Sequence, residues 1–123
     1  MKLSNDKIPN GIKPIEAYKK IRSWYQNNLS KLDGTTSSGQ RSIRLIQNLP
    51  SADVIQPVEI KAVFREVISG KLEWAYHQSD GEYKMSAYAK AALKTIGEDY
   101  SLSENESAEL KKSTLWDFIT QTK

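Results

Sequence analysis

The sequence predicts an all-α protein, a single-domain bundle of about five helices around a central helix at residues 57–78. Three observations lead to this prediction. Apolar residues recur at intervals of three and four along most of the chain, which is the spacing of one helical face. A chain of 123 residues can bury a hydrophobic core without covalent crosslinks. The chain has no cysteine, which excludes disulfides and thiolate metal sites.

The chain divides into a short arm and one helical domain. Residues 1–13 lack apolar periodicity and contain Pro9 and Gly11, so we expect a flexible N-terminal arm there. We expect residues 14–123 to form a single helical domain. Pro14 suits the first position of a helix because its missing N–H needs no partner there.

The first predicted helix runs from Pro14 to Lys31. Its apolar stripe consists of Ile15, Tyr18, Ile21, Tyr25, Leu29 and Leu32. Glu16 in the first turn and Lys31 in the last turn both suit the helix dipole. The opposite face and its flanks carry cations and one large aromatic ring, namely Lys19, Lys20, Arg22 and Trp24.

Residues 33–41 are predicted to form a loop. Gly34 and Gly39 have the G-x-x-x-x-G spacing of a phosphate-binding loop. That motif needs a lysine for the terminal phosphates and a hydroxyl for magnesium, but Gln40 and Arg41 occupy those two positions. We therefore exclude an NTPase.

A second hypothesis for the same loop is an anion site. Ser37 or Ser38 could cap a helix whose free N–H groups bind an anion, assisted by Arg41 and Arg44. The alternative is a mobile polar linker. In either case the next helix is predicted over residues 42–49, and Pro50 ends it.

The central segment, residues 57–78, has the densest apolar content of the chain. Its helical stripe consists of Ile60, Val63, Phe64, Val67 and Ile68. Gly70 interrupts the segment, and beyond it Leu72, Trp74 and Tyr76 alternate as they would in a strand. Because a lone strand has no partner with which to pair, we favour one helix that continues to Gln78.

Two helices and a terminal apolar segment complete the prediction. A helix over residues 82–96 ends at Gly97, and its buried stripe consists of Met85, Tyr88, Ala89, Ala92, Leu93 and Ile96. A capping-box spacing starts another helix near Ser103. The end of the chain holds four large apolar side chains, Leu115, Trp116, Phe118 and Ile119. We expect this segment either to fold back on the core or to dock on a partner protein.

Charge is distributed unevenly along the chain. Residues 1–50 contain nine basic and three acidic residues, a net charge of +6, whereas residues 51–123 contain nine basic and twelve acidic residues, a net charge of −3. A basic half is typical of a surface that binds a polyanion. This number of basic residues is also ordinary in soluble proteins, where the charges simply keep the protein dissolved.

The residues support two hypotheses of function. In the first, the protein is a non-catalytic nucleic-acid-binding or nucleoprotein-complex accessory protein, with Trp24 stacking and phosphates contacted by Lys19, Lys20, Arg22, Arg41 and Arg44. In the second, it is a protein–protein adaptor, inhibitor or small regulatory subunit. Its docking residues would be Leu115, Trp116, Phe118 and Ile119, or the aromatic group Trp74, Tyr76 and Tyr83.

No constellation typical of an enzyme is found in the sequence. His77 is the single histidine, and no motif marks a serine nucleophile. We therefore expect no catalytic residues, no metal, no cofactor and no small-molecule substrate. No apolar run approaches the roughly 20 residues of a membrane span, and the N-terminus lacks the features of a signal peptide. We expect a cytoplasmic protein without a membrane partner.

Overall fold

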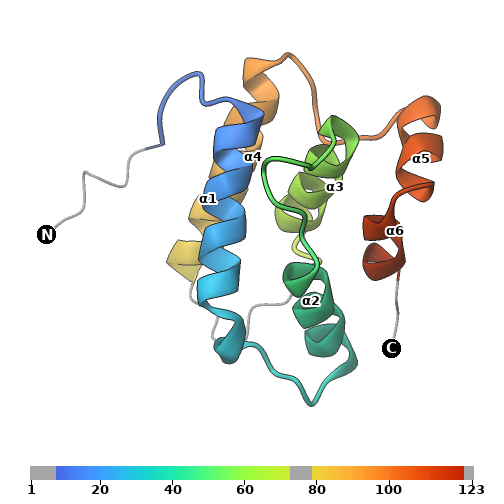
Figure 1. The fold of residues 1–123 in the computed structure, drawn as a ribbon. Coiled ribbons are helices and arrows are strands. Elements are labelled where there is room, and N and C mark those ends of the chain that lie inside the picture. Colours follow the sequence, from blue (N-terminus) through green and yellow to red (C-terminus); the bar gives the residue numbers. More distant parts are fainter. Residues whose placement is uncertain (1–7, 73–78, 121–123) are drawn as a thin grey trace, which may run out of the picture.

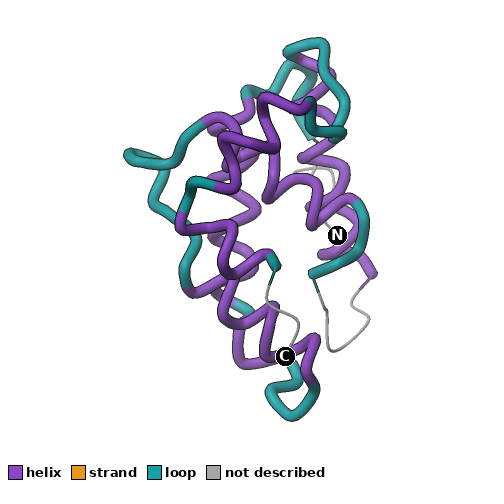
Figure 2. The backbone as a smooth tube through the Cα atoms, turned by 90° about the vertical axis from the view of Figure 1, so that its right-hand side faces the viewer, coloured by secondary structure: helices purple, strands orange, loops and turns teal. Residues whose placement is uncertain are grey.

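The computed structural model describes residues 8–72 and 79–120 of the chain. Within these residues it contains six α-helices and one short 3-10 helix, with no strand (Figures 1 and 2). These elements are α1 (Pro14–Asn27), η2 (Leu29–Lys31), α2 (Ser37–Gln47), α3 (Pro57–Ile68), α4 (Ser79–Thr95), α5 (Glu104–Lys111) and α6 (Thr114–Ile119). The predicted all-α fold is confirmed.

The helices are arranged around α1, α3 and α4. Helix α3 packs against α1, α4 and α5, while α1 also packs against α2 and along α4. Helix α6 packs against both α2 and α5. Figure 1 shows α1 in front of α4, with α2 and α3 beside this pair and with α5 and α6 at the side that carries the C-terminus.

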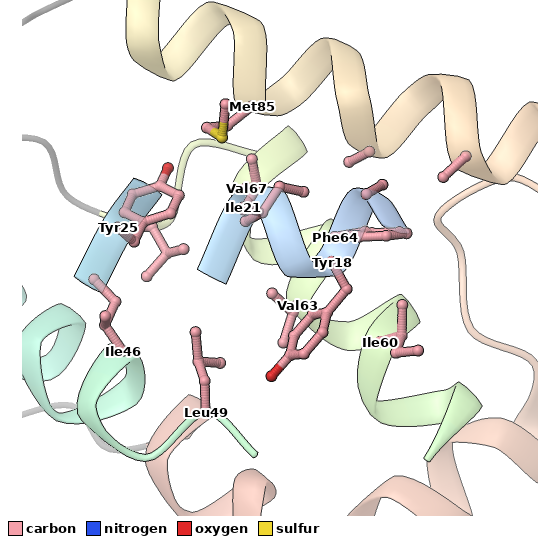
Figure 3. Packing of buried hydrophobic residues seen from close by; sticks show 14 of the residues in the cluster. Tyr18, Ile21, Tyr25, Ile46, Leu49, Ile60, Val63, Phe64, Val67 and Met85 are labelled. Carbon is pink, nitrogen blue, oxygen red and sulfur yellow. The ribbon is translucent and has the colours of Figure 1, made fainter. Parts of the chain in front are cut away.

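The main core lies between α1, α3 and α4. Tyr18 and Phe64 are completely buried in it, and Met85 reaches into it from α4 (Figure 3). The Tyr18 hydroxyl donates a hydrogen bond of 2.5 Å to the carbonyl oxygen of Pro50. Ala17 on α1 and Ala89 on α4 have no exposed surface, and such small side chains let two helices approach closely.

Helix α1 begins at Pro14 as predicted, but it ends four residues earlier than predicted. Its last residue is Asn27, and residues 29–31 form the 3-10 helix η2. The Asn28 side chain donates to the carbonyl oxygen of Trp24 at 2.7 Å, and the Asn28 N–H donates to that of Tyr25. Both bonds satisfy carbonyl groups in the last turn of α1 that have no partner within the helix, so Asn28 terminates α1.

Helix α2 begins at Ser37, five residues before the predicted start. Thr36, rather than a serine, is its N-cap, and the Thr36 hydroxyl accepts a 2.9 Å hydrogen bond from the Gly39 N–H. A Cβ at Gly39 would lie 1.8 Å from the carbonyl oxygen of Asp33, so only glycine fits this turn. The periodic apolar residues start only at Ile43, and the first turn therefore carries no apolar signal.

Helix α3 ends at Ile68, so the prediction of a helix that continues past Gly70 is wrong. Gly70 has φ of +75°, a left-handed conformation that ends the helix. The N–H groups of Lys71 and Leu72 both donate to the carbonyl oxygen of Glu66. Leu72 is then buried in the core, and residues 73–78 lie outside the described part of the chain.

The N-terminal segment and α4 also differ from expectation. Ile12 is only 6% exposed and belongs to the core, so the expected flexible arm is anchored at this residue. Helix α4 begins at Ser79, three residues before the predicted start. It ends at Thr95, one residue before the predicted end, and Gly97 follows with φ of +74°. Ile96 is 49% exposed, although the sequence places it in the buried stripe.

The two short helices α5 and α6 are stabilised in different ways. The predicted capping box at the start of α5 is confirmed, since the Ser103 hydroxyl accepts from the Glu106 N–H and the Glu106 carboxylate accepts from the Ser103 N–H. Helix α6 folds back on the core. Its residue Leu115 is 2% exposed and belongs to the main apolar cluster.

Candidate functional site

The packing of α1 on α4 creates a surface of cations and aromatic rings. We call it the α1–α4 face and define it by Lys19, Lys20 and Trp24 of α1 and Tyr88 of α4. These four side chains line a shallow hollow of about 460 Å³. Glu16, Ser23, Asn27 and Met85 complete its lining.

The helical period of α1 explains why these side chains reach the surface. Ala17, Tyr18, Ile21 and Tyr25 are buried, and Lys19 and Lys20 therefore lie on the opposite, exposed side. Trp24 is half-buried at the boundary with α4. Its ring meets the ring of Tyr25 edge to face, with the centroids 4.9 Å apart, which fixes the orientation of the indole.

Two weak contacts hold the lysines of the α1–α4 face. The Lys20 Nζ lies 5.9 Å from the centroid of the Tyr88 ring, a cation–π contact. The Lys19 Nζ lies 3.9 Å from a Glu16 carboxylate oxygen, and both side chains are more than half exposed. Exposed pairs of this kind contribute little free energy, so both ammonium groups can turn to a bound anion.

Arg22, predicted to contact phosphate, lies on a different side of α1. Its Nε donates to the carbonyl oxygen of Leu49 at 3.3 Å, and Gln26 on the same side donates to that of Ile46. Arg22 also contacts Tyr18. Burial raises the pKa of the Tyr18 hydroxyl, although the nearby Arg22 guanidinium acts in the opposite direction. Arg22 therefore joins α1 to the end of α2 and does not line the hollow.

Arg41, also predicted to contact phosphate, connects three parts of the fold. Its Nη2 donates to Glu66 Oε1 at 2.6 Å, and its Nε donates to the carbonyl oxygen of Ile119 at 3.0 Å. Its Nη1 donates to the carbonyl oxygen of Lys71 at 3.4 Å. The Arg41 and Glu66 side chains are only 14% and 7% exposed, so this guanidinium is committed to the structure. Arg44, by contrast, is exposed on α2.

The predicted docking residues at the C-terminus pack inward. Leu115 is buried in the main core, and Phe118 is partly buried against it. Trp116 and Ile119 pack against a second apolar cluster formed by Val58, Ala62 and Leu110. A partner would reach Leu115 only if α6 moved. Of the alternative aromatic docking group, Trp74 and Tyr76, like His77, lie outside the described residues, and the side chain of Tyr83 is not described.

Tyr88 is the residue of the α1–α4 face that sequence reasoning missed. The sequence places Tyr88 in the buried stripe of its helix, but in the structure it is half-buried at the edge of that stripe. Its link to Lys20 and Trp24 depends on the pairing of α1 with α4.

Outside this face, the described residues show no metal or membrane feature. In residues 8–72 and 79–120 no three histidine or acidic side chains are grouped to hold a metal ion. None of the helices in these ranges has the length and apolar character needed to cross a membrane. Comparison with models of known protein families, with curated proteins and with solved structures yields no match. The geometry of the chain itself is therefore the basis for a functional proposal.

Proposed function

We propose that this protein binds single-stranded nucleic acid through the α1–α4 face. The observation that carries the proposal is that one hollow gathers two ammonium groups and two aromatic rings from helices that are distant in sequence. In the proposed complex Lys19 and Lys20 contact phosphates, while Trp24 and Tyr88 stack on unpaired bases.

The chemistry of the face favours a single strand over a duplex. Stacking on a protein ring needs a base whose π-face is free, and bases in a duplex have both faces covered by their neighbours. The Lys20 ammonium lies over the Tyr88 ring in the free protein. We propose that a phosphate draws this ammonium away and that a base takes its place on the ring.

The proposal implies weak and salt-dependent binding. Two lysines give two phosphate contacts, for which log K falls with log salt concentration at a slope of about −1.4 on single strands. Stacking on an aromatic side chain adds roughly 1–3 kcal/mol per base and depends little on sequence. We therefore expect binding without base-specific readout.

The test is fluorescence anisotropy with labelled single- and double-stranded RNA and DNA at several salt concentrations. The variant Lys19→Glu/Lys20→Glu should lose binding because its charge repels phosphate. The matched control is Lys111→Glu/Lys112→Glu, which changes the net charge equally at an exposed lysine pair near the end of α5. Circular dichroism is used to check that both variants fold.

Three results would contradict the proposal. The first is that no nucleic acid binds even at low salt. The second is that both charge-reversal variants lose affinity equally. The third is that duplexes bind more tightly than single strands. Equal losses would show that net charge alone attracts the nucleic acid. A duplex preference would exclude stacking by Trp24 and Tyr88.

A further inference from the structure

A separate, larger pocket lies near the start of α1, away from the α1–α4 face. It has a volume of about 780 Å³ and is formed by the start of α1, by α3, by the end of α4 and by α5. Its apolar lining includes Ile15, Val58, Ile60, Phe64, Leu93 and Ile96. Pockets for small organic molecules usually have roughly 300–1,000 Å³ and a mostly apolar lining with a few polar groups.

An ion cluster around the buried Lys61 forms part of the wall of this pocket. The Lys61 Nζ donates to Glu98 Oε1 at 2.9 Å and to Glu106 Oε1 at 3.0 Å, and the Lys61 side chain is 9% exposed. Burial alone would lower the pKa of Lys61, but its hydrogen bonds to the two carboxylates raise the pKa above its ordinary value. Lys61 is therefore charged, and it ties α3 to α5 and to the segment before α5.

The polar part of the lining carries an excess of negative charge. Two ammonium groups, of Lys13 and Lys61, and three carboxylates, of Glu98, Glu106 and Glu109, line the pocket. Lys61 is engaged by Glu98 and Glu106. Glu109 has no ion-pair partner within the described residues and is exposed at the edge of the pocket.

We infer that this pocket binds a small organic cation, an apolar molecule that carries one ammonium group. The apolar body lies against Ile15 and Ile96, which are partly exposed in the pocket, and the ammonium group pairs with the Glu109 carboxylate. An anionic ligand of the same shape is disfavoured because it would meet the excess of carboxylates. Four separate elements line the pocket, which suits one compact molecule better than an extended chain.

The test uses three probes with one rigid apolar body and different head groups, namely 1-adamantanamine, 1-adamantanol and 1-adamantanecarboxylate. Binding is followed by the ¹⁵N–¹H spectrum of the full chain. We expect the amine to bind most tightly and the carboxylate most weakly, with shifts centred on the lining residues. Glu109→Gln should weaken amine binding by about two- to fivefold and leave the alcohol unchanged, because it removes one exposed charge.

Two matched controls separate the pocket from general effects. Glu104→Gln makes the same change on α5 at a residue that does not line the pocket, and it should alter neither ligand. Ile96→Lys places a cation at the half-exposed side of the pocket and should weaken amine binding about tenfold or more. Val54→Lys makes a similar change at a residue that is 61% exposed elsewhere, and it should have no effect.

Several results would overturn the inference. They are no binding of any probe at millimolar concentration, equal affinity for the three head groups, and shifts centred on the α1–α4 face. The inference and the proposed nucleic-acid binding fail independently. Lys19→Glu/Lys20→Glu should keep its affinity for the amine, and Ile96→Lys should keep its affinity for nucleic acid.

Discussion

Helices α3 and α5 lie against each other but are held in opposite ways. Nine of the twelve residues of α3 are buried, six of them apolar, whereas Leu110 is the one buried residue among the eight of α5. Helix α5 is held by its capping box and by the Lys61 ion cluster. Apolar burial therefore stabilises α3, while polar contacts that depend on charge hold α5.

The two helices therefore need not open together. Local opening is easiest where few apolar contacts hold a segment, so α5 should open while α3 stays folded. Hydrogen exchange should show slow amides in α3 at the level of global unfolding and faster amides in α5.

The largest effect is expected in α3. Phe64→Ala removes a completely buried ring and should lower the free energy of unfolding by about 3–5 kcal/mol. Urea unfolding measures the change. Val54→Ala is the control because Val54 is 61% exposed, and it should change stability by less than about 0.5 kcal/mol. A small loss in Phe64→Ala would show that α3 is not the centre of stability.

The next effect concerns Arg41, which joins α2, α3 and α6. Arg41→Ala leaves the buried Glu66 carboxylate without its partner and should cost about 3 kcal/mol. Arg44→Ala, on the exposed side of the same helix, should cost much less. Thermal unfolding followed by circular dichroism compares the two variants. Equal and small losses would argue against a structural role for Arg41.

A smaller effect is expected at the cap of α5. Ser103→Ala removes the hydroxyl that accepts from the Glu106 N–H and should cost about 1 kcal/mol. If α5 opens separately, hydrogen exchange should become faster in α5 and stay unchanged in α3. Faster exchange in both helices would show that they unfold as one unit.

The smallest effect is a dependence on pH confined to α5. The Ser103 N–H and the Lys61 ammonium donate to the Glu106 carboxylate and keep the pKa of Glu106 below its ordinary value. A carboxyl group whose pKa is lower in the folded state than in the unfolded state stabilises the folded state. The stabilisation is complete at a pH above the pKa of the unfolded state. It is lost as the pH falls through the pKa of the folded state. Exchange in α5 should therefore quicken in acid, relative to its intrinsic rate, before exchange in α3 does.

A pair of variants tests the origin of this pH dependence. Glu106→Gln cannot titrate and should remove the acid-induced change in α5. Glu104→Gln, two positions earlier and exposed, should keep it. If both variants keep the change, Glu106 does not cause it.

Much of the fold could be predicted because its signals are local. Pro14 and the capping box at Ser103 each mark a helix start within a few residues, and both starts are confirmed. The first turn of α2 has no apolar residue to reveal it. The end of α3 depends on the left-handed conformation of Gly70, whereas the sequence shows only a glycine that a helix can tolerate at a cost of about 1 kcal/mol.

The candidate site was only partly accessible to sequence reasoning. Lys19, Lys20 and Trp24 follow from the period of one helix, but Tyr88 joins them only through the packing of α1 on α4. The structural role of Arg41 also depends on how distant helices pack, so the sequence alone does not reveal it. Its partners Glu66 and Ile119 are 25 and 78 positions away in the chain.

The contact between Arg41 and the carbonyl of Ile119 has a consequence for how the chain is made. Helix α2 packs on α6, which is synthesised long after it. Until residue 119 has emerged from the ribosome, α2 lacks the surface of α6 on which it packs. The Arg41 guanidinium also lacks the Ile119 carbonyl as an acceptor until then. The packing of α2 on α6 therefore cannot form before residue 119 has emerged, whereas the pairing of α1, α3 and α4 needs only the residues up to Thr95.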